Sequence, residues 1–122
     1  MLVVEDDEDI RDVLATLLHE SGYNVLIAKN GEEALQRLRS EPCRPCVILL
    51  DLWMPVMDGW QFRREQRKDS SLAAIPVVAL SGDDEARALN AAAYLGKPVQ
   101  LQPLVSTVER FCGPGGPTSR RR

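Results

Sequence analysis

The sequence has a single histidine, few cysteines and no long apolar run among its 122 residues. A structural zinc site needs a full set of Cys and His ligands, and the one histidine, His19, falls in a predicted helix. No stretch approaches the roughly 18 apolar residues of a membrane span. The first apolar run, residues 1–4, ends in acids and lacks the regions of a signal peptide. These absences predict a cytoplasmic protein with no zinc and no membrane partner.

The three cysteines are Cys43, Cys46 and Cys112. The first two form a C-x-x-C pair, but the pair precedes an apolar run that is predicted to be a strand. Redox pairs instead use a helix N-terminus to stabilise the thiolate. We therefore favour an interpretation without redox function, in which one cysteine of the pair lies in a loop and the other is buried.

Acidic side chains outnumber basic side chains in this sequence. Fifteen Lys and Arg stand against eighteen Asp and Glu, for a formal net charge of −3. Three of the fifteen are the final residues Arg120, Arg121 and Arg122, so the rest of the chain is clearly acidic. An acidic domain has no electrostatic basis for holding phosphate backbones, and we expect no nucleic-acid partner.

Short apolar runs alternate with segments whose apolar residues recur at helical spacing. The runs predict five strands, at 2–4 with Met1 as a possible extension, 25–28, 46–50, 75–80 and 93–95. The other segments predict five helices, at 8–20, from 30 to at least 38, 59–67, 83–92 and 101–111.

This alternation predicts a doubly wound α/β domain with a parallel sheet and right-handed crossovers. The runs 46–50 and 75–80 are apolar throughout, as strands are when helices cover both faces of a sheet. Residues 113–122 consist only of Gly, Pro, Ser, Thr and Arg, so we expect a disordered tail there.

Acidic residues follow two predicted strands at the point where each strand ends. Glu5, Asp6 and Asp7 come directly after the first strand, and Asp51 ends the third apolar run. In a doubly wound sheet, ligands bind beyond the carboxyl ends of strands at the switch point, so these carboxylates should converge. Clustered carboxylates stay ionised only if a cation joins them, and oxygen ligands favour Mg²⁺. One carboxylate could then attack phosphorus.

Helix capping is the alternative interpretation for the first group, because Asp and Glu commonly cap helices. Residues 5–7 taken alone would most often be caps. Asp51 differs, because it closes a strongly apolar run and opens a loop with Met54-Pro55 and Asp58-Gly59. A partly buried acid without a partner would be costly at that position.

A hydroxyl and an ammonium group follow two further strands. Ser81 ends the run 75–80 and precedes Gly82, so its hydroxyl could reach a phosphoryl oxygen; capping the next helix is its alternative role. Lys97 follows the fifth strand and could neutralise a phosphoryl oxygen; a solvated loop lysine is its alternative role. Together with the acids, they predict a phosphoryl-accepting site.

Four motifs, in order and in register, resemble the receiver domains of bacterial response regulators over about residues 1–111. The motifs are VVEDDEDIR, LLDLWMPVMDGW, VVALSG and AYLGKP, at the first, third, fourth and fifth strands. The resemblance implies a flavodoxin-like (βα)5 three-layer sandwich with sheet order 2-1-3-4-5. It also implies a receiver domain at 1–112, before the tail at 113–122.

The resemblance implies a role for each site residue. It implies Mg²⁺ ligands at Glu5, Asp6, Asp51 and the backbone carbonyl of Trp53. It implies phosphorylation on Asp51, catalytic support from Lys97 and Ser81, and a conformational switch through Ser81 and Tyr94. It also implies a cis peptide at Lys97-Pro98, as is usual only before proline, and tuning of phosphoryl loss by Trp53 and Asp83. Asp7 has no fixed family role, and we expect a surface acid.

The implied function is Mg²⁺-dependent phosphoryl transfer to Asp51 from a histidine kinase or histidine phosphotransfer protein, which switches partner binding. One departure concerns the stretch between Ser81 and Lys97, which is short for the family. It predicts a shortened fourth helix, so the usual output surface is in question. The acceptor chemistry is unaffected.

Three other functions are weighed against this one. A phosphatase of the haloacid dehalogenase type needs a second Asp two positions after the first, where this chain has Trp53, so we expect no turnover enzyme. A flavin-binding protein would place a phosphate loop where Glu5, Asp6 and Asp7 stand. A docking module that works without phosphorylation remains the alternative, although such a module would be expected to lose Asp51, Ser81 or Lys97.

Overall fold

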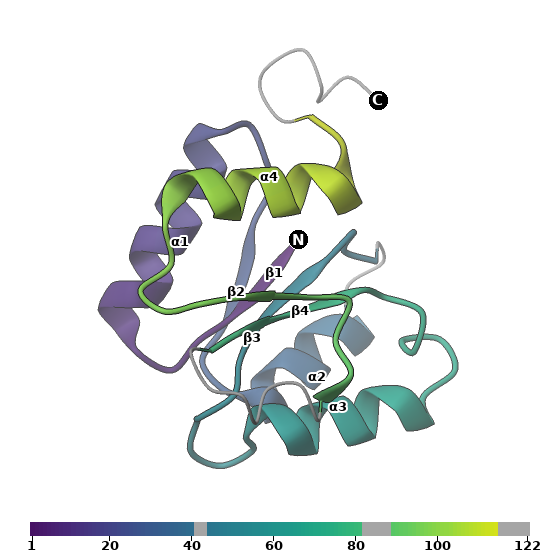
Figure 1. Cartoon of the computed structure of the whole chain (residues 1–122). Coiled ribbons are helices and arrows are strands. Elements are labelled where there is room, and N and C mark those ends of the chain that lie inside the picture. The colour runs from purple at the N-terminus through teal and green to yellow at the C-terminus, as the bar shows by residue number, and fades with distance from the viewer. Residues whose placement is uncertain (41–43, 82–88, 115–122) are drawn as a thin grey trace.

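The computed structural model describes residues 1–40, 44–81 and 89–114, in which helices cover both faces of a parallel five-stranded sheet (Figure 1). The strand order is β2-β1-β3-β4-β5, which confirms the predicted order and the doubly wound fold. The strands are β1 (Leu2–Val4), β2 (Leu26–Ala28), β3 (Ile48–Asp51), β4 (Val77–Leu80) and β5 (Ala93–Leu95).

Four helices are described, two on each face of the sheet (Figure 1). Helices α1 (Glu8–Glu20) and α4 (Leu101–Cys112) cover one face, and α2 (Gly31–Ser40) and α3 (Gly59–Lys68) cover the other. The predicted helix at 83–92 falls largely on residues outside the described ranges, as does most of the predicted tail. The domain boundary at residue 112 therefore stays a prediction. No helix of the described residues is long and apolar enough to cross a membrane.

The central strands are buried because both of their faces carry apolar side chains. Every residue of β1, β3 and β4 is buried, as the absence of polar alternation predicted. Side chains of β1 alternate between the two core clusters: Leu2 and Val4 pack toward α2 and α3, and Val3 packs toward α1 and α4. The sheet is therefore a rigid platform for side chains at its carboxyl edge.

The second strand begins at Leu26, one residue after the predicted start at Val25, and two other strands were predicted to begin two residues too early. The fourth strand begins at Val77 and not at Ile75, because Pro76 has no N–H for the ladder and contributes only its carbonyl, which accepts from Ile48 N at 2.9 Å. The third strand begins at Ile48 and not at Cys46. In both cases the apolar run continues into the loop that precedes the strand.

Gly59 lets α3 start directly against the end of β3. A Cβ at Gly59 would lie 2.8 Å from Leu52 Cα and 2.9 Å from Asp51 O, which are backbone atoms that have little room to move. We predict that Gly59→Ala lowers the free energy of unfolding by about 2 kcal/mol through overpacking, measured by urea denaturation. Gly96→Ala is the matched control, because a Cβ at Gly96 would meet nothing within 4 Å. Equal losses in both variants would contradict this account.

Candidate functional site

The carboxyl ends of β1, β3, β4 and β5 border a cleft of about 360 Å³. Its lining contains every predicted metal-ligating and catalytic residue, and its members are Glu5, Asp6, Asp7, Ile10, Asp51, Trp53, Leu80, Ser81 and Lys97. Four separate loops therefore bring these residues to one edge of the sheet, as the switch-point argument predicted. Ile10 and Leu80 also line the cleft, although their places in an apolar helix stripe and an apolar strand had suggested only packing.

A shared lysine joins two buried carboxylates in this cleft. Lys97 Nζ lies 2.9 Å from Asp51 Oδ1 and 3.1 Å from Glu5 Oε1. Asp51 is 3% exposed and Glu5 is 1% exposed, so neither carboxylate is solvated by bulk water. Lys97 follows β5 and precedes Pro98 through a cis peptide bond, which confirms the predicted cis bond. The acceptor candidate and the cation are thus in direct contact.

Burial and the neighbouring charge of Asp51 both oppose the ionisation of Glu5. Burial, and then the charge of Asp51, raises the pKa of Glu5 to about 7. The Asp7 N–H, which donates to Glu5 Oε2 at 3.2 Å, and the charge of Lys97 oppose this rise. Burial lowers the pKa of Lys97, but its contacts with Asp51 and Glu5 outweigh burial and raise it overall. The lysine therefore stays cationic, and two carboxylates share its charge.

The acids of the cleft fit a divalent cation. One carboxylate oxygen from each of Glu5, Asp6 and Asp51 can be chosen so that the three lie within 4.8 Å of one another. Two of these residues are buried and Asp6 is exposed, so the group opens to solvent on one side. A set of oxygen ligands with excess negative charge suits Mg²⁺, which usually keeps several waters. A cation here would also relieve the repulsion that raises the pKa of Glu5.

Asp7 separates from this group and caps a helix. Its carboxylate accepts from the N–H groups of Asp9 and Ile10 at 3.0 and 3.1 Å, at the start of α1. The capping alternative therefore holds for Asp7, whereas Glu5 and Asp6 face Asp51. The run of acids after β1 divides into a helix cap and two candidate ligands.

The aromatic residues and the hydroxyl occupy different parts of the site. Ser81 lines the cleft beside β4, where its N–H donates to Leu95 O at 2.9 Å. Trp53 is 55% exposed at the rim and packs edge-on against Trp60, with ring centroids 4.7 Å apart. Tyr94 lies on β5 away from the lining, and its hydroxyl accepts from Ala91 N at 3.2 Å. Asp83 lies outside the described residues.

The interpretation of the cysteines was wrong for Cys46. Cys46 is only half-buried and forms a disulfide with Cys112, the last residue of α4. Two cysteines separated by 66 positions gave no local signal of pairing, and the fold alone brings their Cα atoms to 5.3 Å. Cys43 lies outside the described residues.

Comparisons with known proteins agree with the geometry. The family model described as the response regulator receiver domain matches residues 1–109. The polar-differentiation response regulator DivK of Brucella anthropi is 31% identical over 93% of this chain and 95% of its own length. The chemotaxis response regulator CheY4 of Vibrio cholerae superposes with a TM-score of 0.80 at 32% identity, covering 90% of this chain and 95% of that one. The signal receiver domain of a Syntrophus aciditrophicus signal transduction histidine kinase gives a TM-score of 0.79 at 30% identity, covering 99% and 91%.

Proposed function

This chain belongs to the response regulator receiver domains of two-component signalling, and on that premise we propose that Asp51 accepts a phosphoryl group from a phosphohistidine donor. The observation that carries the proposal is the position of Asp51. Its carboxylate ends a buried strand, contacts Lys97 Nζ at 2.9 Å and lies in one cleft with Ser81 and three further acids.

In the proposed reaction, an Asp51 oxygen attacks the phosphorus of the donor as the bond from phosphorus to the donor imidazole nitrogen breaks. The product is an acyl phosphate on Asp51, and the departing imidazole takes up a proton. Lys97 lies close enough to Asp51 to stay near the transferred group and balance its charge. The Ser81 hydroxyl lines the same cleft and would donate to a phosphoryl oxygen. Catalysis is then positioning and electrostatic stabilisation.

We assign the metal site to the carboxylates of Glu5, Asp6 and Asp51, with the backbone carbonyl of Trp53 as a further ligand. Bound Mg²⁺ would supply charge stabilisation for the phosphoryl oxygens. The chain's own share is to hold two of the carboxylates rigidly, since Glu5 and Asp51 are buried at the ends of adjacent strands. Asp6 is exposed and can adjust its position.

The partner that fits this chemistry is a histidine kinase or a histidine phosphotransfer protein. Such donors obtain their phosphoryl group from ATP, which supports a cytoplasmic location. Phosphorylation would shift the population toward a state in which Ser81 and Tyr94 are drawn toward the site, and this state would bind a downstream protein differently. Trp53 occupies the position where a phosphatase would need its second acid, so we propose that the chain does not turn over small phosphate esters.

The test is intact-mass spectrometry of the full chain after incubation with acetyl phosphate and Mg²⁺. We expect one phosphoryl adduct, which is lost when EDTA removes the metal. Circular dichroism in EDTA checks that the fold is retained, so that the loss reports the site. A folded chain that takes no phosphoryl group from acetyl phosphate or from a phosphohistidine donor would overturn the proposal and favour docking without phosphorylation.

Trp53 should shield the acyl phosphate from water. Its ring covers the rim of the cleft, and packing against Trp60 restricts its rotation. We predict that Trp53→Ala increases the rate of phosphoryl loss several-fold, measured by the decay of the adduct mass after the donor is removed. Trp60→Phe is the control, because it alters the aromatic pair but leaves Trp53 at the rim. An unchanged or slower loss in Trp53→Ala would rule out the shielding role.

A further inference from the structure

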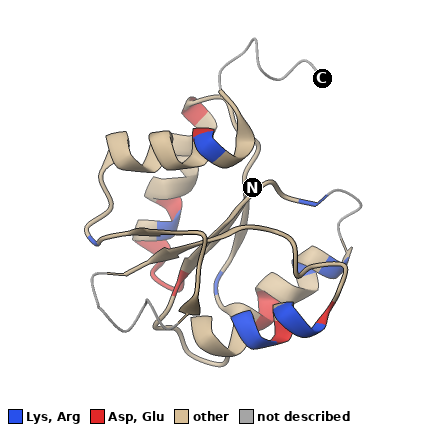
Figure 2. Ribbon diagram, turned by 45° about the vertical axis from the view of Figure 1, so that its right-hand side comes forward, with Lys and Arg blue, Asp and Glu red and all other residues tan. Residues whose placement is uncertain are grey.

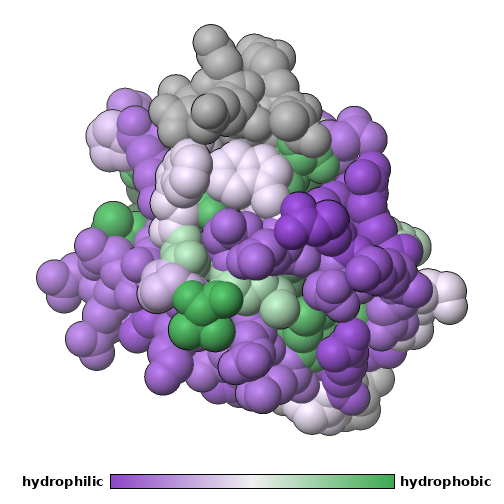
Figure 3. All heavy atoms as spheres, turned by 90° about the horizontal axis from the view of Figure 1, so that it is seen from below, coloured by the Kyte–Doolittle hydropathy of each residue, from purple (hydrophilic) through white to green (hydrophobic). Residues whose placement is uncertain are grey.

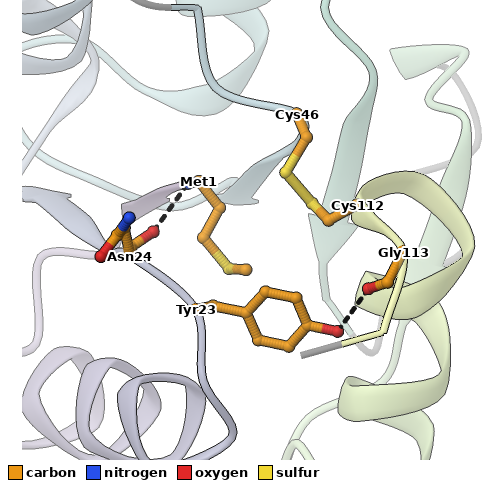
Figure 4. Close-up of a disulfide and its surroundings, with 6 residues drawn as sticks. All are labelled: Met1, Tyr23, Asn24, Cys46, Cys112 and Gly113. Carbon is orange, nitrogen blue, oxygen red and sulfur yellow. Dashed lines mark hydrogen bonds between the residues drawn. A yellow bond between two sulfur atoms is a disulfide. The ribbon is translucent and has the colours of Figure 1, made fainter. Parts of the chain in front are cut away.

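The disulfide lies at the edge of the sheet opposite the phosphoryl site. Cys46 precedes β3, whereas Asp51 ends β3, so the length of the strand separates the two features. Figure 4 shows Cys46 on the segment that leads into β3 and Cys112 at the end of α4. Changes at the disulfide can therefore occur without touching the residues that line the cleft.

Cys112 occupies the last position of the buried stripe of α4. Leu104 and Val108 are the buried residues of this helix, and Cys112 follows Val108 at the same spacing of four. The intervening Glu109 and Arg110 are exposed, and Phe111 is half-buried. The covalent bond to Cys46 is therefore a main attachment of the last turn of α4 to the sheet.

One hydrogen bond continues this attachment beyond the helix. The Tyr23 hydroxyl donates to Gly113 O at 2.7 Å, and Figure 4 shows the Tyr23 ring directed toward Gly113 beside the disulfide. Tyr23 is buried in the same core cluster as Val108. The disulfide and this hydrogen bond together fix where the chain leaves the domain after residue 113.

The apolar core of the fold consists of buried residues other than the two cysteines of the disulfide. Two apolar clusters hold the sheet, and their fully buried members include Leu2, Ile48 and Leu104. Disulfides are usually required in small secreted domains whose apolar core is too small to hold the fold. This chain instead has two apolar core clusters. Cys46 and Cys112 are half-buried and pack against one of the core clusters, so neither residue is fully enclosed. We expect a reductant to approach the bond from the exposed side of these residues.

We propose that Cys46 and Cys112 form a reversible redox-modification site that clamps the end of α4 when oxidised and releases it when reduced. Disulfides in reducing compartments are usually transient and redox-sensing, and the reversible character of this bond rests on the cytoplasmic location given with the proposed function. The reductant is a protein dithiol of the thioredoxin class. Its thiolate attacks one sulfur and breaks the bond, and its second thiol resolves the mixed disulfide. The dithiol is oxidised by two electrons, and two protons end on Cys46 and Cys112. In the reverse direction a low-molecular-weight disulfide such as glutathione disulfide takes up the two electrons and leaves as two thiols when Cys46 and Cys112 rejoin.

The test uses the full chain carrying Cys43→Ser, so that only the proposed pair can react. The folded chain is treated with a thioredoxin-class dithiol or with glutathione disulfide, alkylated with a maleimide and weighed. We expect no adduct in the oxidised chain, two after reduction, and none again after reoxidation. A bond that opens only in urea, or two reactive thiols under every condition, would overturn the proposal.

Amide hydrogen exchange measures whether the disulfide holds the last turn of α4 in place. We expect amides of residues 109–113 to exchange on the order of tenfold faster after reduction, because the last turn of α4 then opens locally. Amides in the last turn of α3 are the internal control, since that helix packs on the other face of the sheet. Cys112→Ser should reproduce the reduced pattern. Unchanged exchange at 109–113 would overturn the release.

The acetyl phosphate assay is run on both redox forms to separate this proposal from the proposed function. A chain that opens and closes the disulfide but never gains a phosphoryl group would overturn phosphoryl acceptance and support the redox site. A chain that is phosphorylated but whose disulfide resists the dithiol would support phosphoryl acceptance and overturn the redox site.

Discussion

Replacing Asp51 by asparagine should abolish the phosphoryl adduct completely. The amide has nearly the same shape as the carboxylate but lacks its negative charge and is a poor nucleophile toward phosphorus. Other carboxylates should not substitute for Asp51. Glu5 is buried and held by Lys97 and by the Asp7 N–H, and Asp6 stands on the solvent side of the acidic group. Intact mass after incubation with acetyl phosphate and Mg²⁺ measures the result.

The fold of this variant should be retained, because asparagine can accept the hydrogen bond from Lys97 that Asp51 accepts at 2.9 Å. The variant also removes the Asp51 charge that contributes to the raised pKa of Glu5, so that pKa should fall, as measured by NMR titration. Asp12→Asn is the matched control, since Asp12 is exposed on α1 and outside the cleft lining. An adduct that persists in Asp51→Asn would move the acceptor to another residue.

The structure brings the predicted site residues to one edge of the sheet because each of them stands at or near the end of a strand. Glu5, Asp51, Ser81 and Lys97 each stand within two residues of a strand's carboxyl end, and parallel strands bring those ends to one edge. The sequence alone could not show which of the acids after β1 caps a helix and which faces the cleft. Asp7 turns back to cap α1, whereas Glu5 is 1% exposed and bonded to Lys97, and this difference arises from backbone direction and not from residue type.

The distribution of charge could also be predicted only in part from the sequence. Composition indicated an acidic chain, but the structure separates the charges, with basic residues gathered on α3 and acidic residues along α1 (Figure 2). The face seen from below the sheet is mostly hydrophilic with a few apolar residues between (Figure 3). Residue counts cannot show such separation, because it depends on which helix covers which face. The pairing of Cys46 with Cys112 depends on tertiary packing in the same way.

Reducing the disulfide should lower the free energy of unfolding by about 4 kcal/mol in the chain-entropy account. The bond joins residues 66 positions apart, and a cross-link over so long a span removes many conformations from the unfolded chain. The reduced chain should nevertheless stay folded at room temperature, since domains of this size unfold at a cost of roughly 5–15 kcal/mol. The buried members of both core clusters also include neither cysteine of the cross-link.

Urea denaturation of the Cys43→Ser chain, with and without a dithiol, measures this difference. At slopes typical of small domains, the midpoint should fall by about 2 M on reduction. Cys112→Ser should unfold near the reduced midpoint in both conditions, which shows that the reductant acts only through the pair. If reduction leaves the midpoint unchanged in the Cys43→Ser chain, then packing of Leu104, Val108 and Phe111 and the Tyr23 hydrogen bond are enough to hold the end of α4. In that case the cross-link constrains the unfolded state little, and its opening could not alter the stability of the domain.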